Sequence, residues 1–263
     1  MKRKLIFIKK YFSVARFIGL ALIKSFNKKQ RSNISNIYDT YVHPIDNRPW
    51  EVGPLQDIRL DSIVNPRDMA NISYPEEVDG NVTLFELWVI SALIRKNNFY
   101  RIFEIGTFEG RTTFNISQNC SMKAEIYTLD LPKTDIQHSK YLILDSEKKY
   151  IEKDSSGEKF KGSHSKNKII QLYGDSATFD FSPFYNTIDL VFIDGSHSYK
   201  YVINDSLKAY SMVRNGGIII WHDYSHQGGW TDVNKALKYL QQNEKRFSSL
   251  SHVNKTTFAY LKK

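Results

Sequence analysis

The end of one predicted β-strand and the turn that follows it carry three residues with the types and spacing of a ligand-binding turn. Glu104, Gly106 and Gly110 lie within the run Phe-Glu-Ile-Gly-Thr-Phe-Glu-Gly-Arg-Thr-Thr. Gly106 allows a sharp turn, and Gly110 lets the backbone of a following helix approach a ligand without interference from a Cβ atom. A turn with a purely structural role would use the same glycines, so this motif by itself indicates only a candidate site.

The spacing of these glycines argues against a dinucleotide site. Position 108 is Phe, and no third glycine follows in the register of the dinucleotide fingerprint. A pyrophosphate prefers an uncluttered helix terminus, whereas an acid such as Glu104 suits the cationic amino-acid end of S-adenosylmethionine. The turn therefore favours S-adenosylmethionine over a nicotinamide dinucleotide.

Polar residues after the next two predicted strands suit the nucleoside part of such a ligand. Asp130 ends one strand, where a carboxylate can accept both hydroxyls of a ribose. Gly174, Asp175 and Ser176 end the following strand and offer short polar groups to an adenine edge. Helix capping is the alternative role for these side chains.

Two further strand ends carry carboxylates and imidazoles. Asp194 and His197 follow one predicted strand, and His222 and Asp223 follow the next. Adjacent parallel strands lie about 4.8 Å apart, so we expect Asp194, His222 and Asp223 to converge and to suit a divalent cation such as Mg²⁺. Alternatively, His197 or His222 is the base that takes a proton from a hydroxyl, or both are ordinary hydrogen-bonded loop residues.

The elements that must position these side chains alternate along the chain. A capping-box pattern at Thr83 and Glu86 predicts a helix through about Asn97. Five short β-rich runs follow, most of them separated by helix-like stretches: residues 101–106, 125–130, 169–173, 188–194 and 217–222. This alternation predicts an α/β fold with an open, doubly wound and mostly parallel sheet, whose ligands bind at the carboxyl ends of the strands.

Residues outside this alternation complete the predicted organisation. β-like runs at 247–253 and 257–261 predict a C-terminal antiparallel hairpin, which brings the sheet to seven strands. The polar insert 131–168 is either a lid or binding loop on the ligand face or a disordered segment. Residues 32–80 hold five of the seven prolines and predict a loop-rich extension before the domain at 81–263.

The formal charge of +9 is concentrated in an N-terminal arm. Residues 1–31 hold ten Lys or Arg and no acid, which leaves 27 basic and 28 acidic residues in the rest of the chain. A body with a net charge of −1 is not expected to bind nucleic acid. Apolar residues interleave with the basic ones in the arm without reaching the length of a membrane span, so we expect either peripheral contact with an anionic membrane or a basic leader that aids solubility.

Cysteine content bears on the compartment. Cys120 is the only cysteine, so the chain forms no internal disulfide. This composition favours a reducing compartment. We therefore expect a cytoplasmic protein that associates with the inner face of the membrane through the arm.

Taken in order, these blocks resemble a known family. The runs at 103–113, 127–132, 171–183, 192–199 and 221–224 are similar to the bacterial class I S-adenosylmethionine-dependent methyltransferases related to catechol O-methyltransferase. The similarity extends over about residues 70–261. It implies a Rossmann-like sheet, S-adenosylmethionine as the cofactor and methyl transfer as the reaction.

The resemblance also implies roles for individual residues. Glu104, Phe108 and Thr112 would lie near the methionine end of the cofactor and Asp130 on its ribose, with Ser176 and Asp194 nearby. Thr107 and Leu131, next to these positions, complete the expected cofactor-binding set. Asp194, His222 and Asp223 occupy the positions that bind magnesium in the catechol enzyme, but His222 replaces an acid and Asp223 an amide.

These observations predict an O-methyltransferase with a small-molecule or glycan acceptor: a sugar, a polysaccharide precursor or a small metabolite. The predicted catalytic residues are His197, His222 and Asp223. The alternatives are a non-catalytic module that binds S-adenosylmethionine and a nucleotide-dependent oxidoreductase. A nucleic-acid methyltransferase is disfavoured, because Asp194-Gly-Ser-His stands where those enzymes carry Asp or Asn followed by Pro-Pro and an aromatic residue.

Overall fold

The structure is a computed structural model that describes residues 55–163, 168–225 and 230–263. The predicted arm at 1–31 and the first part of the predicted extension, 32–54, lie outside these described residues. Among the residues described, no helix is long and apolar enough to cross a membrane.

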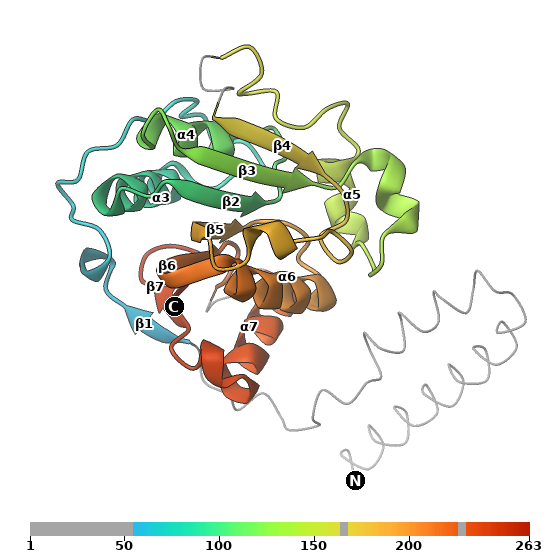
Figure 1. Ribbon diagram of the computed structural model, residues 1–263. Helices are drawn as coiled ribbons and strands as arrows, with labels where there is room; N and C mark the ends of the chain where they lie inside the picture. Colours follow the sequence, from blue (N-terminus) through green and yellow to red (C-terminus); the bar gives the residue numbers. More distant parts are fainter. Residues whose placement is uncertain (1–54, 164–167, 226–229) are drawn as a thin grey trace, which may run out of the picture. The chain divides into compact units, whose positions relative to one another are not determined.

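One eight-stranded sheet forms the centre of the described chain, with strand order β1-β7-β8-β6-β5-β2-β3-β4. All strand pairs are parallel except those of β8 with β6 and with β7. The strands are β1 (Gln56–Ile58), β2 (Arg101–Ile105), β3 (Glu125–Asp130), β4 (Ile169–Tyr173), β5 (Ile188–Ile193), β6 (Val213–Trp221), β7 (Ser251–Val253) and β8 (Ala259–Lys262). Figure 1 shows β2, β3 and β4 side by side, with their carboxyl ends at one edge.

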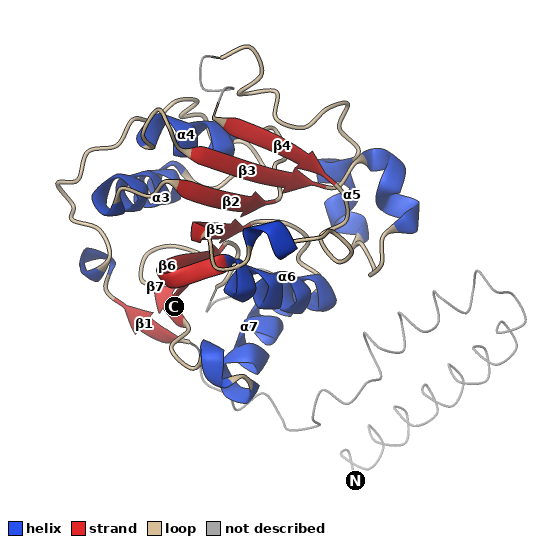
Figure 2. Cartoon of the chain, viewed as in Figure 1, coloured by secondary structure: helices blue, strands red, loops and turns tan. Residues whose placement is uncertain are grey.

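Helices cover both faces of this sheet (Figure 2). The two pairs that do so are α3 (Leu84–Asn97) with α4 (Arg111–Asn119), and α6 (Tyr199–Met212) with α7 (Thr231–Asn243). The short α5 (Lys148–Ile151) lies within the insert, together with 3-10 turns at Lys133–His138 and Asp145–Glu147. The insert therefore has ordered secondary structure of its own.

The hydrophobic core is divided by the sheet into two layers. In β5, Leu190 and Phe192 face the α3 and α4 side, whereas Val191 and Ile193 face the α6 and α7 side. Side chains alternate in this way because successive residues of a strand point to opposite faces. All six residues of β5 are buried, as expected for a central parallel strand covered on both faces.

The predicted fold class is confirmed, and the strand count is eight instead of seven. The additional strand, β1, comes from the segment predicted to be loop-rich, and it pairs with β7 through Gln56 and Ser251. Three residues are too few to show an alternating pattern, so pairing with the sheet edge decides this strand. The predicted capping box is present, because the Thr83 hydroxyl accepts a hydrogen bond from the Glu86 N–H.

Candidate functional site

Strand register brings the predicted site residues to one level of the sheet. Ile105 pairs with Leu129 on one side and Ile193 on the other, and Ile193 pairs with Trp221. The residues that follow these positions therefore lie side by side at the carboxyl edge: Gly106, Asp130, Asp194 and His222.

A pocket of about 400 Å³ opens at this edge. Most of the predicted site residues line it: Gly106, Thr107, Phe108, Thr112, Asp130, Leu131, Gly174, Asp175, Ser176, Asp194, His197, His222 and Asp223. Glu104 and Gly110 are the two predicted residues that do not line the pocket.

The two glycines of the turn are required by contacts within the protein. Both have left-handed backbones, with φ of +98° at Gly106 and +82° at Gly110. A Cβ atom on Gly106 would overlap the Asp194 carbonyl oxygen, and one on Gly110 would lie 2.6 Å from the Phe160 ring. Gly106 thus allows β2 and β5 to approach closely, and Gly110 makes room for the insert.

Glu104 lies behind the pocket wall. It is 1 % exposed, and its Oε2 atom accepts hydrogen bonds from the hydroxyls of Thr113 and Thr128. Burial, together with the charges of Asp194 and Asp130, raises the pKa of Glu104 to about 8. The predicted contact between Glu104 and the amino-acid end of a cofactor stays a prediction.

Asp130 contacts residues of the insert at the place predicted for a ribose. Its carboxylate accepts hydrogen bonds from the Ser156 hydroxyl and, at 3.3 Å, from the Thr107 N–H. The Lys153 ammonium lies 2.7 Å from Oδ2 of Asp130. Insert residues therefore supply donors to the carboxylate that was predicted to bind the ribose hydroxyls.

The predicted adenine region has one carboxylate with partners and one hydroxyl without. Asp175 accepts hydrogen bonds from the backbone N–H groups of Lys140 at 2.7 Å and Ala177 at 2.8 Å. The Tyr201 hydroxyl, from α6, is buried at the pocket wall with no hydrogen-bond partner among the described residues. Burial and the nearby Asp175 carboxylate raise the pKa of this hydroxyl.

His222 lies among three carboxylates. Its Nδ1 atom is 3.0 Å from Asp194 Oδ1 and 3.1 Å from Asp223 Oδ2, and its Nε2 atom is 3.6 Å from Glu86 Oε2. Burial lowers the pKa of His222, but the three carboxylates outweigh it and raise that pKa well above its usual value. This environment favours a buried imidazolium whose charge offsets the carboxylates, and it disfavours the predicted role of His222 as a base.

His197 is held between two carboxylates. Its Nδ1 atom is 2.7 Å from Glu147 Oε1, and its Nε2 atom is 2.6 Å from Asp223 Oδ2. The Trp230 ring stacks on the imidazole with centroids 4.1 Å apart. Burial opposes protonation, but Asp223 and Glu147 raise the pKa of His197 to about 9.

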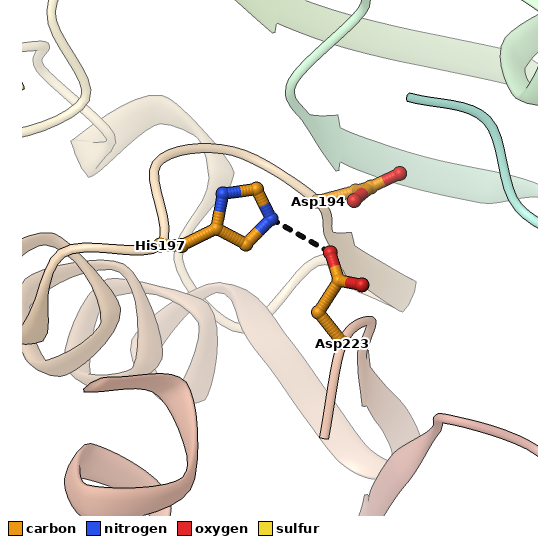
Figure 3. A group of neighbouring side chains, drawn as sticks. All are labelled: Asp194, His197 and Asp223. Carbon is orange, nitrogen blue, oxygen red and sulfur yellow. Dashed lines mark hydrogen bonds and ion pairs between the residues drawn. The ribbon is translucent and has the colours of Figure 1, made fainter. Parts of the chain in front are cut away.

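Three side chains are close enough to share a metal ion. Asp194, His197 and Asp223 each offer a ligand atom, and these atoms lie within 4.8 Å of one another (Figure 3). Asp223 reaches this position from a left-handed backbone with φ of +63°. The group differs from the predicted set, because His197 takes the place of His222. Two carboxylates and an imidazole suit a divalent cation.

Comparison with known proteins relates part of the chain to one family. The family described as "Methyltransferase domain" matches residues 103–224, which span β2 to the end of β6 and the polar residues after it. This part of the chain therefore resembles a methyltransferase domain. An uncharacterized protein of Acanthamoeba polyphaga mimivirus is 34 % identical to this chain over 125 residues. That match covers 46 % of this chain and about half the length of the viral protein.

A solved structure shares the fold of this chain. An O-methyltransferase from Bacillus cereus, in complex with SAH, matches with a TM-score of 0.50 at 14 % identity, over 71 % of this chain and 84 % of its own. The O-methyltransferase TomG from Streptomyces achromogenes, in complex with SAM, matches with a TM-score of 0.47 at 16 % identity, over 69 % of this chain and 81 % of its own.

Several residues at the pocket were not predicted from the sequence as site residues. Four of them line it: Glu86, Glu147, Lys153 and Trp230. Ser156 contacts the pocket residue Asp130. The sequence identified Glu86 only as part of a capping box. Its additional contact with His222 could not be predicted from that pattern. The insert residues belong to no motif, so only their distances from Asp130 and His197 indicate a role.

Proposed function

We propose that this protein is a methyltransferase that uses S-adenosylmethionine and transfers the methyl group to a hydroxyl oxygen. The observation that carries the proposal is that one pocket joins the Gly106 turn and Asp130 to the cluster of Asp194, His197 and Asp223. The turn and Asp130 suit a ligand made of a nucleoside with an amino-acid tail. The cluster suits the removal of a proton from an acceptor hydroxyl. The Bacillus cereus protein is described with SAH, and we extend that cofactor class to this chain.

Charge in the pocket supports a cationic cofactor. Seven carboxylates line it, against one lysine and two histidines: Asp79, Glu86, Asp130, Glu147, Asp175, Asp194 and Asp223. The sulfonium and ammonium groups of S-adenosylmethionine are favoured by such walls, and an anionic acceptor is disfavoured. We therefore propose an uncharged, hydroxyl-rich acceptor: a sugar, a polysaccharide precursor or a small metabolite.

Methyl transfer in this pocket would be a direct displacement. The acceptor oxygen bonds to the methyl carbon as the carbon–sulfur bond breaks, and the sulfonium becomes the neutral thioether of S-adenosylhomocysteine. The hydroxyl proton would pass to a carboxylate oxygen of Asp194 or Asp223, because the raised pKa of His197 favours an imidazole that is already protonated. The protein's main contribution is to hold donor and acceptor in line, which by itself is worth about 7–11 kcal/mol in well-oriented reactions.

The proposal includes a divalent cation such as Mg²⁺. It would be held by Asp194, His197 and Asp223. Such an ion would lower the pKa of the acceptor hydroxyl. His222, on the other side of Asp194 and Asp223, keeps these carboxylates in place through its two contacts of 3.0 and 3.1 Å.

Calorimetry and turnover test the proposed function. We expect heat on titration with S-adenosylmethionine or S-adenosylhomocysteine and none with NAD. With a hydroxylated acceptor, we expect Asp223→Asn to lower kcat about 100-fold, within the range of a lost proton-transfer group, while cofactor binding is kept. Heat with NAD alone would indicate an oxidoreductase. Cofactor heat without transfer to any acceptor of a broad panel would indicate a non-catalytic binding module.

We also propose that the basic arm, residues 1–31, brings the enzyme to an anionic membrane surface from the cytoplasmic side. Ten basic residues without an acid support this interpretation, since each Lys or Arg near such a surface contributes about 1 kcal/mol. A membrane-adjacent enzyme would meet precursors of surface polysaccharides there.

A further inference from the structure

Glu147 is a buried carboxylate in an otherwise polar insert. It ends the 3-10 turn Asp145–Glu147 that leads into α5, and its side chain is 4 % exposed. Asp145, two residues earlier in the same turn, is 95 % exposed and pairs with Lys148 at the surface. Burying a carboxylate is costly unless it is hydrogen-bonded, so the contacts of Glu147 indicate what its burial achieves.

Both oxygens of Glu147 are used on the loop that follows β5. Oε1 accepts hydrogen bonds from the backbone N–H of His197 and, at 2.7 Å, from the Nδ1 atom of its ring. Oε2 accepts from the Ser196 hydroxyl at 3.1 Å and from the Leu144 N–H at 3.0 Å. One carboxylate therefore joins the insert to the loop that carries His197.

These contacts orient the imidazole. With Nδ1–H donated to Glu147, the other nitrogen, Nε2, points to Asp223 at 2.6 Å and belongs to the group with Asp194. The Trp230 ring stacks on the imidazole at an interplanar angle of 12°, and this contact limits rotation of the imidazole. A carboxylate on one nitrogen of a histidine is a common way to aim the other nitrogen at a metal or a substrate.

Apolar contacts with α6 hold the part of the insert around Glu147 in place. Ile143 is buried against Tyr201 of α6, with Tyr141 and Ile151 packed beside them. The Tyr141 and Tyr201 rings meet edge to face with centroids 5.4 Å apart. These apolar contacts lie on either side of Glu147 in the sequence and hold its carboxylate at the His197 loop.

We propose that Glu147 is a positioning residue of the acceptor site: it fixes the ring of His197, so that the part of the insert around Glu147 completes the site. The inference rests on the proposed methyl transfer for its kinetic consequence alone. Glu147 touches neither the cofactor nor the acceptor in this proposal, and it acts through His197.

The test compares Glu147→Gln with the matched control Asp145→Asn, which removes an exposed carboxylate from the same turn. In the full-length protein, the Nδ1 proton of His197 should give a downfield NMR signal, assigned by its loss in His197→Gln. We expect Glu147→Gln to abolish or shift this signal and to lower kcat about 10- to 100-fold, with KM for the cofactor unchanged. Asp145→Asn should leave the signal, kcat and KM as they are.

A second variant covers the case in which Glu147→Gln does not fold. Glu147→Asp keeps the charge on a side chain one methylene shorter, and we expect it to retain the downfield signal and a larger kcat than the Gln variant. An unchanged His197 signal in Glu147→Gln, or an equal loss of kcat in Asp145→Asn, would overturn the proposal. The signal requires no turnover, so it tests Glu147 even if the methyl-transfer proposal fails.

Discussion

Gly106 shows how one residue joins two strands at the site. Its φ of +98° is a conformation that L side chains rarely adopt, and the Asp194 carbonyl occupies the place of a Cβ atom. A side chain here would meet two penalties at once: backbone strain and overlap with β5. Asp194 belongs to the cluster with His197 and Asp223. Displacement of its backbone carbonyl would therefore also move its side-chain carboxylate.

The substitution Gly106→Ala should therefore destabilise the protein more than Gly162→Ala does. Gly162 has a similar φ of +80° but nothing within 4 Å of a Cβ atom, so it measures the strain alone. We expect about 1–3 kcal/mol of destabilisation at Gly162 and a greater loss at Gly106, measured by urea unfolding. Equal losses in the two variants would show that the contact with Asp194 has no energetic consequence.

Glu104 makes stability depend on pH. Its pKa is raised from 4.5 to about 8 in the folded protein, so the folded state keeps a proton that the unfolded chain releases. The resulting stability is complete below pH 4.5 and is lost as the pH rises through 8. Its slope is at most about 1.4 kcal/mol per pH unit.

Replacing this carboxyl by an amide should remove that slope. Unfolding of the wild type and Glu104→Gln, measured from pH 5 to 8 without cofactor, should show a flatter profile for the variant. Glu158→Gln changes an exposed glutamate of the insert, whose side chain is 61 % exposed, and should keep the wild-type profile. Parallel profiles for wild type and Glu104→Gln would contradict the assignment.

At the scale of elements, the insert determines what the pocket offers to a ligand. It supplies Glu147 to His197, and it supplies Lys153 and Ser156 to Asp130. A ribose that binds Asp130 through its hydroxyls must replace the donors of the insert. The same segment thus contacts both the predicted cofactor half and the acceptor half of the pocket.

Removing one of these donors should strengthen cofactor binding. In Lys153→Met, the ammonium 2.7 Å from Asp130 is absent, so a ribose hydroxyl has one donor fewer to replace at this carboxylate. We expect the Kd for S-adenosylhomocysteine, measured by calorimetry, to fall about 2- to 10-fold, equivalent to about 0.4–1.4 kcal/mol. Lys161→Met, which removes a more exposed insert lysine paired with Glu158, is the control. Weaker binding in Lys153→Met would show that Lys153 assists the cofactor.

At the scale of the whole molecule, the charge is divided between two parts of the chain. The arm, residues 1–31, carries +10, and the other residues together carry −1. Attraction to an anionic surface would therefore come from the arm. Salt should weaken it, because charges exposed to solvent are screened over about 8 Å at physiological ionic strength.

Sedimentation with anionic liposomes tests the role of the arm. We expect the full chain to pellet with the vesicles at low salt and to be released at about 1 M salt, where the Debye length is about 3 Å. Lys9→Glu and Lys10→Glu together should reduce pelleting, and pelleting on neutral vesicles should be weak. Equal pelleting of the full chain and a chain without residues 1–31 would exclude the arm as the membrane contact.

The order of elements and 13 of the 31 residues that line the pocket were predictable from the sequence. Strands and helices are recorded in local patterns, such as the Thr83–Glu86 capping box and the apolar run of β5. Parallel strands place their carboxyl ends together, so residues after β2, β3, β5 and β6 had to meet at one edge. This rule required no knowledge of side-chain directions.

Tertiary structure decided which side chains meet at that edge. His197 offers a ligand atom to a metal ion together with Asp194 and Asp223, and its contact with Glu147 sets the direction of its ring. His222 contacts the same two carboxylates at 3.0 and 3.1 Å. Glu147 is 50 residues from His197 in the sequence. No local sequence pattern predicts a contact between residues so far apart in the chain. This contact depends on how the insert packs against α6, whereas the helices and strands depend on patterns within each segment.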